Sequence, residues 1–206
     1  MLVATAFFTA FLASLVGATS FLQSISAFPQ LSNFTNLYQN NPFLTSLLTP
    51  NSTTPRYTVL VPNNDAFTRY QSDYGYAVTG LSSADLQTLI SYHVLVVGLN
   101  NDNFTRPKGL AVPTLLIGQM YNNRTPGSAL ENDFGNNADG QIVYISPTSS
   151  SGTATVQSGL GMNATLSAID GTWDGGLIQE IDEYVPIGDQ ISLVLSDFSV
   201  KYCAGF

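Results

Sequence analysis

Charge is scarce in this chain. Only 10% of its 206 residues are charged, whereas about a quarter are charged in an average soluble domain. Six Lys and Arg residues stand against 14 Asp and Glu residues, and the formal net charge is −8. So few cations cannot neutralise several phosphates, which argues against a nucleic acid partner and against an anionic membrane surface. The polar surface must consist mainly of Ser, Thr, Asn, Gln and Gly.

Histidine and cysteine occur once each, as His93 and Cys203. A Ser-His-Asp triad would have to use His93, and a zinc site lacks the ligands that it needs. No intrachain disulfide can form, so packing alone must hold the core together. Cys203 can be an inert thiol or can pair between chains. Phosphate-binding loops, nucleophile elbows and paired-histidine metal motifs are also missing, so we expect no catalytic residue, cofactor or metal.

The first 18 residues, MLVATAFFTAFLASLVGA, contain no charged side chain and no proline. The run is too short for a comfortable transmembrane span, and it ends in small residues. Val16 and Ala18 occupy the −3 and −1 positions of a plausible cleavage site. The pattern predicts a signal peptide at residues 1–18 and no stable membrane span; a buried N-terminal helix is the alternative.

Acceptor sequons of the form Asn-x-Ser/Thr occur five times, and none is blocked by proline. They begin at Asn33, Asn51, Asn103, Asn123 and Asn163. The sequons favour a glycosylated extracellular surface, on which sugars would supply the solubility that the missing charges do not.

The stretch RYTVLVPNNDAF indicates a strand that changes abruptly into a helix. Tyr57 to Val61 are β-branched, aromatic or aliphatic, which favours a strand, and Pro62 cannot donate to a ladder and ends it. Asn63 or Asn64 can then cap a helix, with Asp65 in its first turn. We interpret the segment as a structural hinge held by side-chain hydrogen bonds.

Helices are expected before this hinge and strands predominate after it. Ser82 and Asp85 have the spacing of a capping box, and the helix that follows places His93 on its apolar face. From Gly98 onward, alternating runs separated by turn residues predict strands. These runs are VPTLLIGQMY, GQIVYIS, TATVQSG, GMNATLSAID and GGLIQEIDEYV. The region 122–140 is expected to be an exposed loop, and the whole pattern predicts one α+β domain.

Carboxylates are the remaining candidates for chemistry. Asp133, Asn137 and Asp139 faintly resemble a calcium loop, but the glutamate that such a loop needs is missing, and a solvated turn is favoured. Glu180 and Asp182 should share one face of a strand. Paired carboxylates can hydrolyse glycosides, although the sequence does not fix their separation.

Three stretches together resemble the fasciclin-like domain family. YTVLVPNNDAF is similar to the family's first signature, a strand followed by Pro-Thr-Asn-Asp-Ala-Phe, and Asn63 stands where Thr is usual. LISYHVL is similar to its Tyr-His segment. GGLIQEIDEYVPI is similar to its second signature, Asn-Gly-Val-Ile-His-x-Ile-Asp, with Gly175 in place of Asn and Gln179 in place of His. The matched positions are Pro62, Asn64, Asp65, Ala66, Phe67, Tyr92, His93, Gly176, Ile178, Ile181 and Asp182.

The resemblance implies an α+β wedge in which two packed β-sheets carry a cluster of short helices from the N-terminal half. The domain would occupy residues 19–188, followed by a C-terminal segment, 189–206, of unclear status. The implied role is a non-catalytic extracellular adhesion or binding module of the cell surface, matrix or cell wall. Its partner would be an extracellular protein or a wall or matrix glycan.

The resemblance also nominates Tyr92 and His93 for partner binding, because the Tyr-His segment is linked to receptor binding in animal members. A side chain on an apolar helix face is poorly placed to meet a partner. We therefore favour a structural role for His93, hydrogen-bonded to the hinge around Asn64 and Asp65. Two rival functions remain open: a cell-wall carbohydrate-binding module or glycosidase, and a structural wall component whose glycans matter more than its protein surface.

Overall fold

A computed structural model of the chain describes residues 19–50, 56–104, 106–118, 127–147 and 153–185. The expected signal peptide, the C-terminal segment 189–206, Asn51, Asn123 and Cys203 lie outside the described residues.

The described helices are short. They are α1 (Phe21–Ser26), α2 (Ser32–Gln39), α3 (Pro42–Leu47), α4 (Asn64–Tyr74), α5 (Ser83–Tyr92), α6 (Asn101–Phe104) and α7 (Ser128–Phe134), with 3-10 turns η1 (Pro29–Leu31), η2 (Val78–Gly80) and η3 (Gly135–Asn137). The strands are β1 (Tyr57–Pro62), β2 (Val94–Leu95), β3 (Leu110–Pro113), β4 (Ile142–Ser146), β5 (Ala154–Gln157), β6 (Asn163–Trp173) and β7 (Gly176–Ile181).

The seven described strands are hydrogen-bonded in the order β2-β1-β7-β6-β5-β4-β3. Strand β1 runs parallel to β7, and the other pairs are antiparallel. The longest strand, β6, pairs with β5 near its start and with β7 beyond that, and its register with β7 shifts between Ser167 and Gly171. Such an irregularity lets a strand bend, so one strand can serve both halves of the sheet.

The two ends of this sheet also meet. Leu95 in β2 bridges Thr114, which follows β3, and the N–H of Leu115 donates to the carbonyl oxygen of Val94 at 2.8 Å. The α+β class is therefore confirmed, but the two sheets expected from the resemblance are joined into one continuous sheet that folds back on itself. Closure of this kind pairs the outer strands and hides backbone groups that an open edge would expose.

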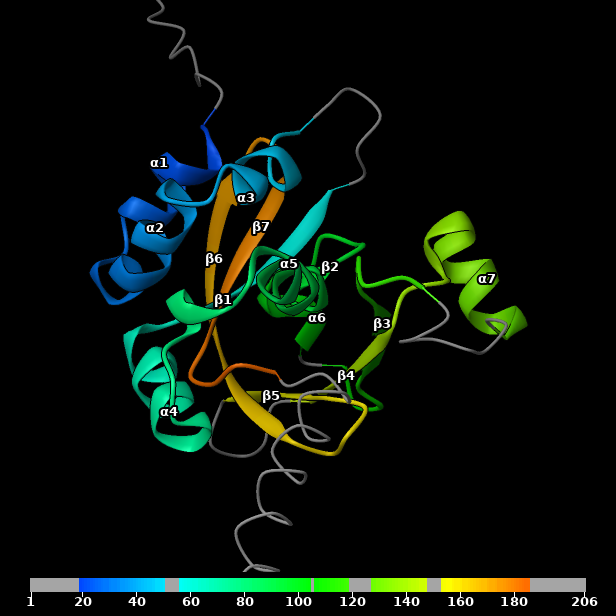
Figure 1. Cartoon of the computed structure of the whole chain (residues 1–206). Helices are drawn as coiled ribbons and strands as arrows, with labels where there is room; N and C mark the ends of the chain where they lie inside the picture. Colours follow the sequence, from blue (N-terminus) through cyan, green and yellow to red (C-terminus); the bar gives the residue numbers. More distant parts are fainter. Residues whose placement is uncertain (1–18, 51–55, 105, 119–126, 148–152, 186–206) are drawn as a thin grey trace, which may run out of the picture.

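The N-terminal helices cover one end of the sheet. Figure 1 shows α1, α2 and α3 gathered beside β6 and β7, while α7 stands apart on the opposite side of the molecule. Phe21 of α1 holds this layer in place, because its ring centroid lies 5.2 Å from that of Tyr38 and 5.2 Å from that of Trp173 in β6. All three side chains are buried. The contact with Trp173 is edge-to-face, a geometry that adds to the hydrophobic gain from burial.

Most local expectations agree with the structure. The hydroxyl oxygen of Ser82 accepts from the N–H of Asp85 at 3.2 Å, so the capping interaction at the start of α5 is present. Strands β4, β5 and β7 lie within the runs that predicted them, and β6 begins within its run and extends three residues beyond it, to Trp173. The helix α4 ends at Tyr74 and is capped by Gly75, whose φ of 77° is a left-handed conformation that glycine adopts without strain.

Two local expectations were wrong. Among the described residues of the run VPTLLIGQMY, only the first two belong to a strand, because β3 ends at Pro113. The chain then turns at Thr114, whose hydroxyl donates to the carbonyl oxygen of Gln141 at 2.8 Å. The region 122–140 contains helix α7 and turn η3 rather than only a loop. No side chain of α7 is buried. A helix that buries no apolar face needs no apolar stripe, and without such a stripe the sequence did not predict this helix.

Candidate functional site

The three stretches that carry the family resemblance meet along β1. Strand β1 lies between β2, which follows the Tyr-His segment, and β7, which carries the second signature. Val59 is aligned with Val94 on one side and with Ile178 on the other. Because Val59 and Ile178 are 119 positions apart in the chain (178 − 59), this convergence is a property of the fold and not of local sequence.

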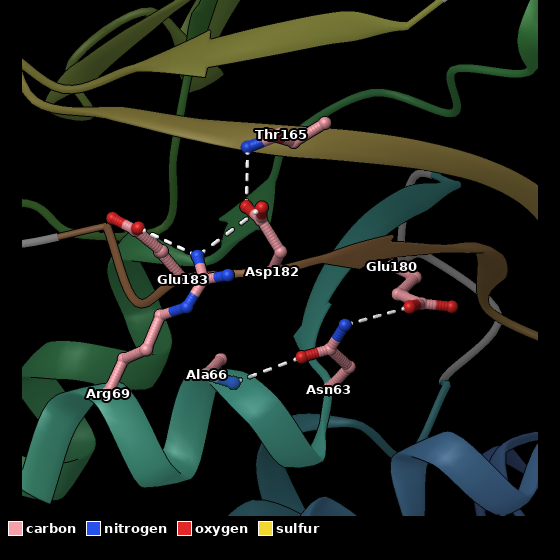
Figure 2. A network of polar contacts seen from close by, with 7 residues as sticks. All are labelled: Asn63, Ala66, Arg69, Thr165, Glu180, Asp182 and Glu183. Carbon is pink, nitrogen blue, oxygen red and sulfur yellow. Dashed lines mark hydrogen bonds and ion pairs between the residues drawn. The ribbon is translucent and has the colours of Figure 1, made fainter.

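Asn63 forms the hinge after β1 (Figure 2). Its side-chain oxygen accepts from the N–H of Ala66 at 3.0 Å, which is the N-cap bond of α4. Its side-chain amide donates to Glu180 at 2.9 Å, and its backbone N–H donates to the carbonyl oxygen of Ile181 at 2.9 Å. The hinge is therefore tied to β7 by both backbone and side chain. Of the two asparagines that the sequence offered as caps, Asn63 is the one used.

Asn64 faces the N-terminal helices instead. Its side-chain oxygen accepts from the N–H of Asn33 at 3.0 Å, and its amide donates to the hydroxyl of Ser32 at 3.1 Å. It thus satisfies free donors at the start of α2, which has no capping side chain of its own. Asp65 is exposed in the first turn of α4, where a negative charge is favoured by the helix dipole. Phe67 is half-buried and packs on Tyr184 at 5.4 Å between ring centroids.

The carboxylates after β7 bind groups within the domain. One carboxylate oxygen of Asp182 accepts from the N–H of Thr165 at 2.6 Å, and the other lies 3.5 Å from the guanidinium of Arg69. Glu183 lies 2.9 Å from the same guanidinium. Figure 2 shows Arg69 reaching from α4 to both carboxylates. These contacts fasten α4 to the end of β7.

Tyr92 and His93 are buried, with exposed fractions of 0% and 1%. The hydroxyl of Tyr92 donates to the carbonyl oxygen of Ile142 at 3.3 Å and accepts from the N–H of Gly159 at 3.1 Å. It therefore joins the end of α5 to β4 and to the turn after β5. Neither side chain is available to touch a partner at the surface of this structure.

His93 has two polar partners, and neither belongs to the hinge. Its Nδ1 lies 2.7 Å from the carbonyl oxygen of Leu89, and its Nε2 accepts from the N–H of Val185 at 3.0 Å. The expected bond to Asn64 or Asp65 is wrong, because His93 ends α5 and its ring packs beside Tyr184. Burial lowers the pKa of His93 to about 4, although its bond to Leu89 opposes this. The ring is therefore neutral at pH 7.

The second signature supplies β7. Ile178 and Ile181 are fully buried, and a Cβ at Gly176, whose φ is 151°, would overlap the backbone of Tyr57. Gln179 takes the place of the family's usual histidine and is also fully buried. Its amide donates to the carbonyl oxygen of Leu99 at 2.9 Å and to the carboxylate of Asp170 at 2.7 Å. Gln179 therefore has a defined structural task, which the sequence did not reveal.

The described sequons differ in exposure. The side chains of Asn33 and Asn163 are exposed, on α2 and at the start of β6. Asn103 is half-buried in α6, and its side-chain oxygen accepts from the N–H of Asn100 at 2.9 Å.

The described residues include no group of three or more His, Cys, Asp or Glu side chains that could hold a metal ion. The residues of the faint calcium motif are placed in α7, in η3 and after it, as Asp133, Asn137 and Asp139. No helix in the part of the chain that the structure describes has the length and apolar character that a membrane crossing requires.

A groove lies between α2, α4 and η2. It has a volume of about 560 Å³, and its lining combines amide and hydroxyl groups with apolar side chains. The lining residues are Asn33, Asn36, Leu37, Asn40, Asn41, Phe67, Thr68, Gln71, Ala77, Val78, Thr79, Leu81 and Leu86. The sequence did not predict this groove, because three separate segments form it. Only the unusual number of Asn residues between positions 33 and 41 gave a signal.

The model of the fasciclin domain family matches residues 29–185 of the chain. The chain belongs to the fasciclin domain family. Members of this family are usually extracellular binding or adhesion modules, and they are generally non-catalytic.

Two relatives are informative. A fasciclin-like arabinogalactan protein of Phaeosphaeria nodorum is 26% identical over 186 residues, which are 90% of this chain and 53% of that protein. The structure of a domain pair from the insect cell adhesion molecule Fasciclin I matches with a TM-score of 0.50 and 21% identity. That match covers 77% of this chain and 45% of the insect chain, and it supports the fold alone. The chain thus spans about half the length of each relative.

Proposed function

We propose that this fasciclin domain is a secreted, N-glycosylated adhesion module that binds an extracellular protein or a wall or matrix glycan without transforming it. The proposal extends the family's usual role to this chain. The names of the two relatives agree with it, since one is an arabinogalactan protein and the other a cell adhesion molecule. The uncharged segment 1–18 and the sequons support secretion.

One observation supports the non-catalytic part of the proposal: the candidate reactive side chains are already bonded to groups within the domain. Both ring nitrogens of His93 are engaged inside the core, and the ring is closed to solvent. A general base must reach the proton that it removes, so this histidine has no access to a substrate. The carboxylates of Asp182 and Glu183 pair with Arg69, and Asp182 also accepts from the N–H of Thr165, so both bind groups within the domain.

The main experiment is a pull-down with the purified protein from wall or matrix extract, followed by a bead adhesion assay on the material retained. We expect specific, saturable binding that survives repeated washing, and we expect the retained protein or glycan to be recovered unchanged. Weak single contacts can still give firm adhesion when many copies act together, so the beads should carry the domain at high density.

A turnover assay on wall polysaccharides tests the rival glycosidase function on the same preparation. Release of reducing ends that depends on Glu180 or Asp182 would overturn the non-catalytic proposal. Failure of glycosidase-treated protein to adhere, with intact folding, would instead favour the rival in which the glycans carry the function.

A further inference from the structure

Asn33 is both a sequon asparagine and part of the groove wall. Its side chain is exposed and makes no hydrogen bond to another described residue, whereas its backbone N–H donates to the side-chain oxygen of Asn64. A sugar attached to its side-chain nitrogen would therefore begin at the groove. Asn163, the other exposed sequon asparagine among the described residues, does not line the groove.

The chemistry of the groove suits a neutral sugar. None of its lining residues carries a charge, although the chain as a whole has a net charge of −8. Asn36 and Gln71 present side-chain amides that have no hydrogen-bond partner in the described structure, and each amide offers two donors and an acceptor. Hydroxyl and N-acetyl groups of a sugar are matched to these amides, and the groove supplies no ion pair for a charged ligand.

The apolar part of the groove suits the other faces of the same ligand. Leu37, Phe67 and Leu81 also contribute to its lining. These surfaces can cover the C–H faces and the N-acetyl methyl group of a sugar, and burial of such apolar area is favourable. The volume of about 560 Å³ also falls in the range of about 300–1,000 Å³ that small-ligand sites occupy.

We propose that the first sugars of an N-glycan on Asn33 lie in the groove between α2 and α4 and join the two helices. The occupant is thus a modification of this chain and not a separate molecule. The inference depends on the secretion and glycosylation proposed above but not on adhesion. A docked glycan would add contacts between two short helices that each bury only a few side chains.

The test compares protein secreted by a glycosylating eukaryotic host with the same chain made in a bacterium. Mass spectrometry of peptides first establishes whether Asn33 carries a glycan. In the secreted protein, Asn33→Gln should lower the melting temperature by about 2–4 °C, the shift that a change of about 1 kcal/mol gives in a domain of this size. In the bacterial protein the same substitution should leave it unchanged. Asn163→Gln is the matched control, because it removes a glycan outside the groove.

Gln71→Ala tests the groove itself. In the secreted protein it should lower the melting temperature and speed amide hydrogen exchange in α2 and α4, but only while Asn33 is intact. The double variant should resemble Asn33→Gln alone, because contacting groups give non-additive effects. An unoccupied Asn33, additive effects, or an equal effect of Asn163→Gln would each overturn the proposal. Adhesion is measured separately on the same proteins. If the unsubstituted protein does not adhere, but the two substitutions change the melting temperature as expected, only the proposed function is overturned.

Discussion

The backbone N–H of Val185 donates to Nε2 of His93 across 3.0 Å, although the two residues are 92 positions apart. A donor at this place requires Nε2 to be unprotonated, and the carbonyl oxygen of Leu89 requires the proton to be on Nδ1. The neutral tautomer is thereby fixed by both partners. A second proton on Nε2 would face the N–H of Val185, and the bond that holds the end of the domain would be lost.

The first prediction concerns the pH dependence of stability. The pKa of His93 is about 4 in the folded protein, below its usual 6.5, so the unfolded chain binds more protons between these values. The contribution of His93 is fully present above pH 6.5 and falls as the pH decreases toward 4. The loss should reach about 3 kcal/mol at pH 4, measured by urea unfolding at a series of pH values.

His93→Leu provides the comparison. It should be less stable at pH 7 by about 1–3 kcal/mol, because the N–H of Val185 remains buried without a partner. It should also lack the part of the pH dependence that His93 causes, while the carboxylates titrate alike in both proteins. Parallel stability curves for the two proteins would show that the buried ring does not titrate as predicted.

The second prediction concerns the cap of α4. Asn63→Ala removes the acceptor for the N–H of Ala66 and the donor to Glu180, and should lower the free energy of unfolding by about 1–2 kcal/mol. Asn63→Thr keeps a capping oxygen but loses the donor, so its loss should be smaller. Chemical denaturation of both variants measures this, and equal losses would mean that the cap contributes little.

The third prediction addresses the nomination of Tyr92 for partner binding. Tyr92→Phe removes only the hydroxyl that bonds Ile142 and Gly159, so thermal stability should fall, by about 1–3 kcal/mol for the groups left unpaired. Adhesion measured well below the melting temperature should be unchanged, because the ring is buried. Normal stability together with lost adhesion would reverse the assignment and make Tyr92 a contact residue.

The fourth prediction concerns the buried amide of Gln179. Asp170 has a φ of 45°, which is uncommon for a residue other than glycine, and its N–H donates to the side-chain oxygen of Gln179 at 3.2 Å. Gln179→Leu leaves this N–H and the carbonyl oxygen of Leu99 without their partner. We expect a loss of about 1–3 kcal/mol in the free energy of unfolding.

Gln179→His, which restores the residue usual in the family, is the matched variant for this site. A neutral imidazole has one donor and one acceptor, so it can replace some of the three bonds and should cost less than leucine. If leucine were tolerated as well as histidine, the amide network would not contribute to stability as the geometry indicates.

The sequence alone determined the local features of this protein. The strand that ends at Pro62, the cap at the start of α4 and the cap at Ser82 depend on residues within four positions of each other, so their spacing predicted them. The order of the helical and alternating patterns predicted the α+β class, and the family resemblance implied the same class.

Tertiary structure alone decided which distant groups meet. Three features join segments that are distant in the sequence. They are the bond from Val185 to His93, the bridge between Leu95 and Thr114, and the groove beside Asn33. Whether such segments meet depends on how the helices pack on the folded sheet. A buried polar group needs a partner but does not specify which one, so the sequence could predict that His93 is satisfied and could not name the atom that satisfies it.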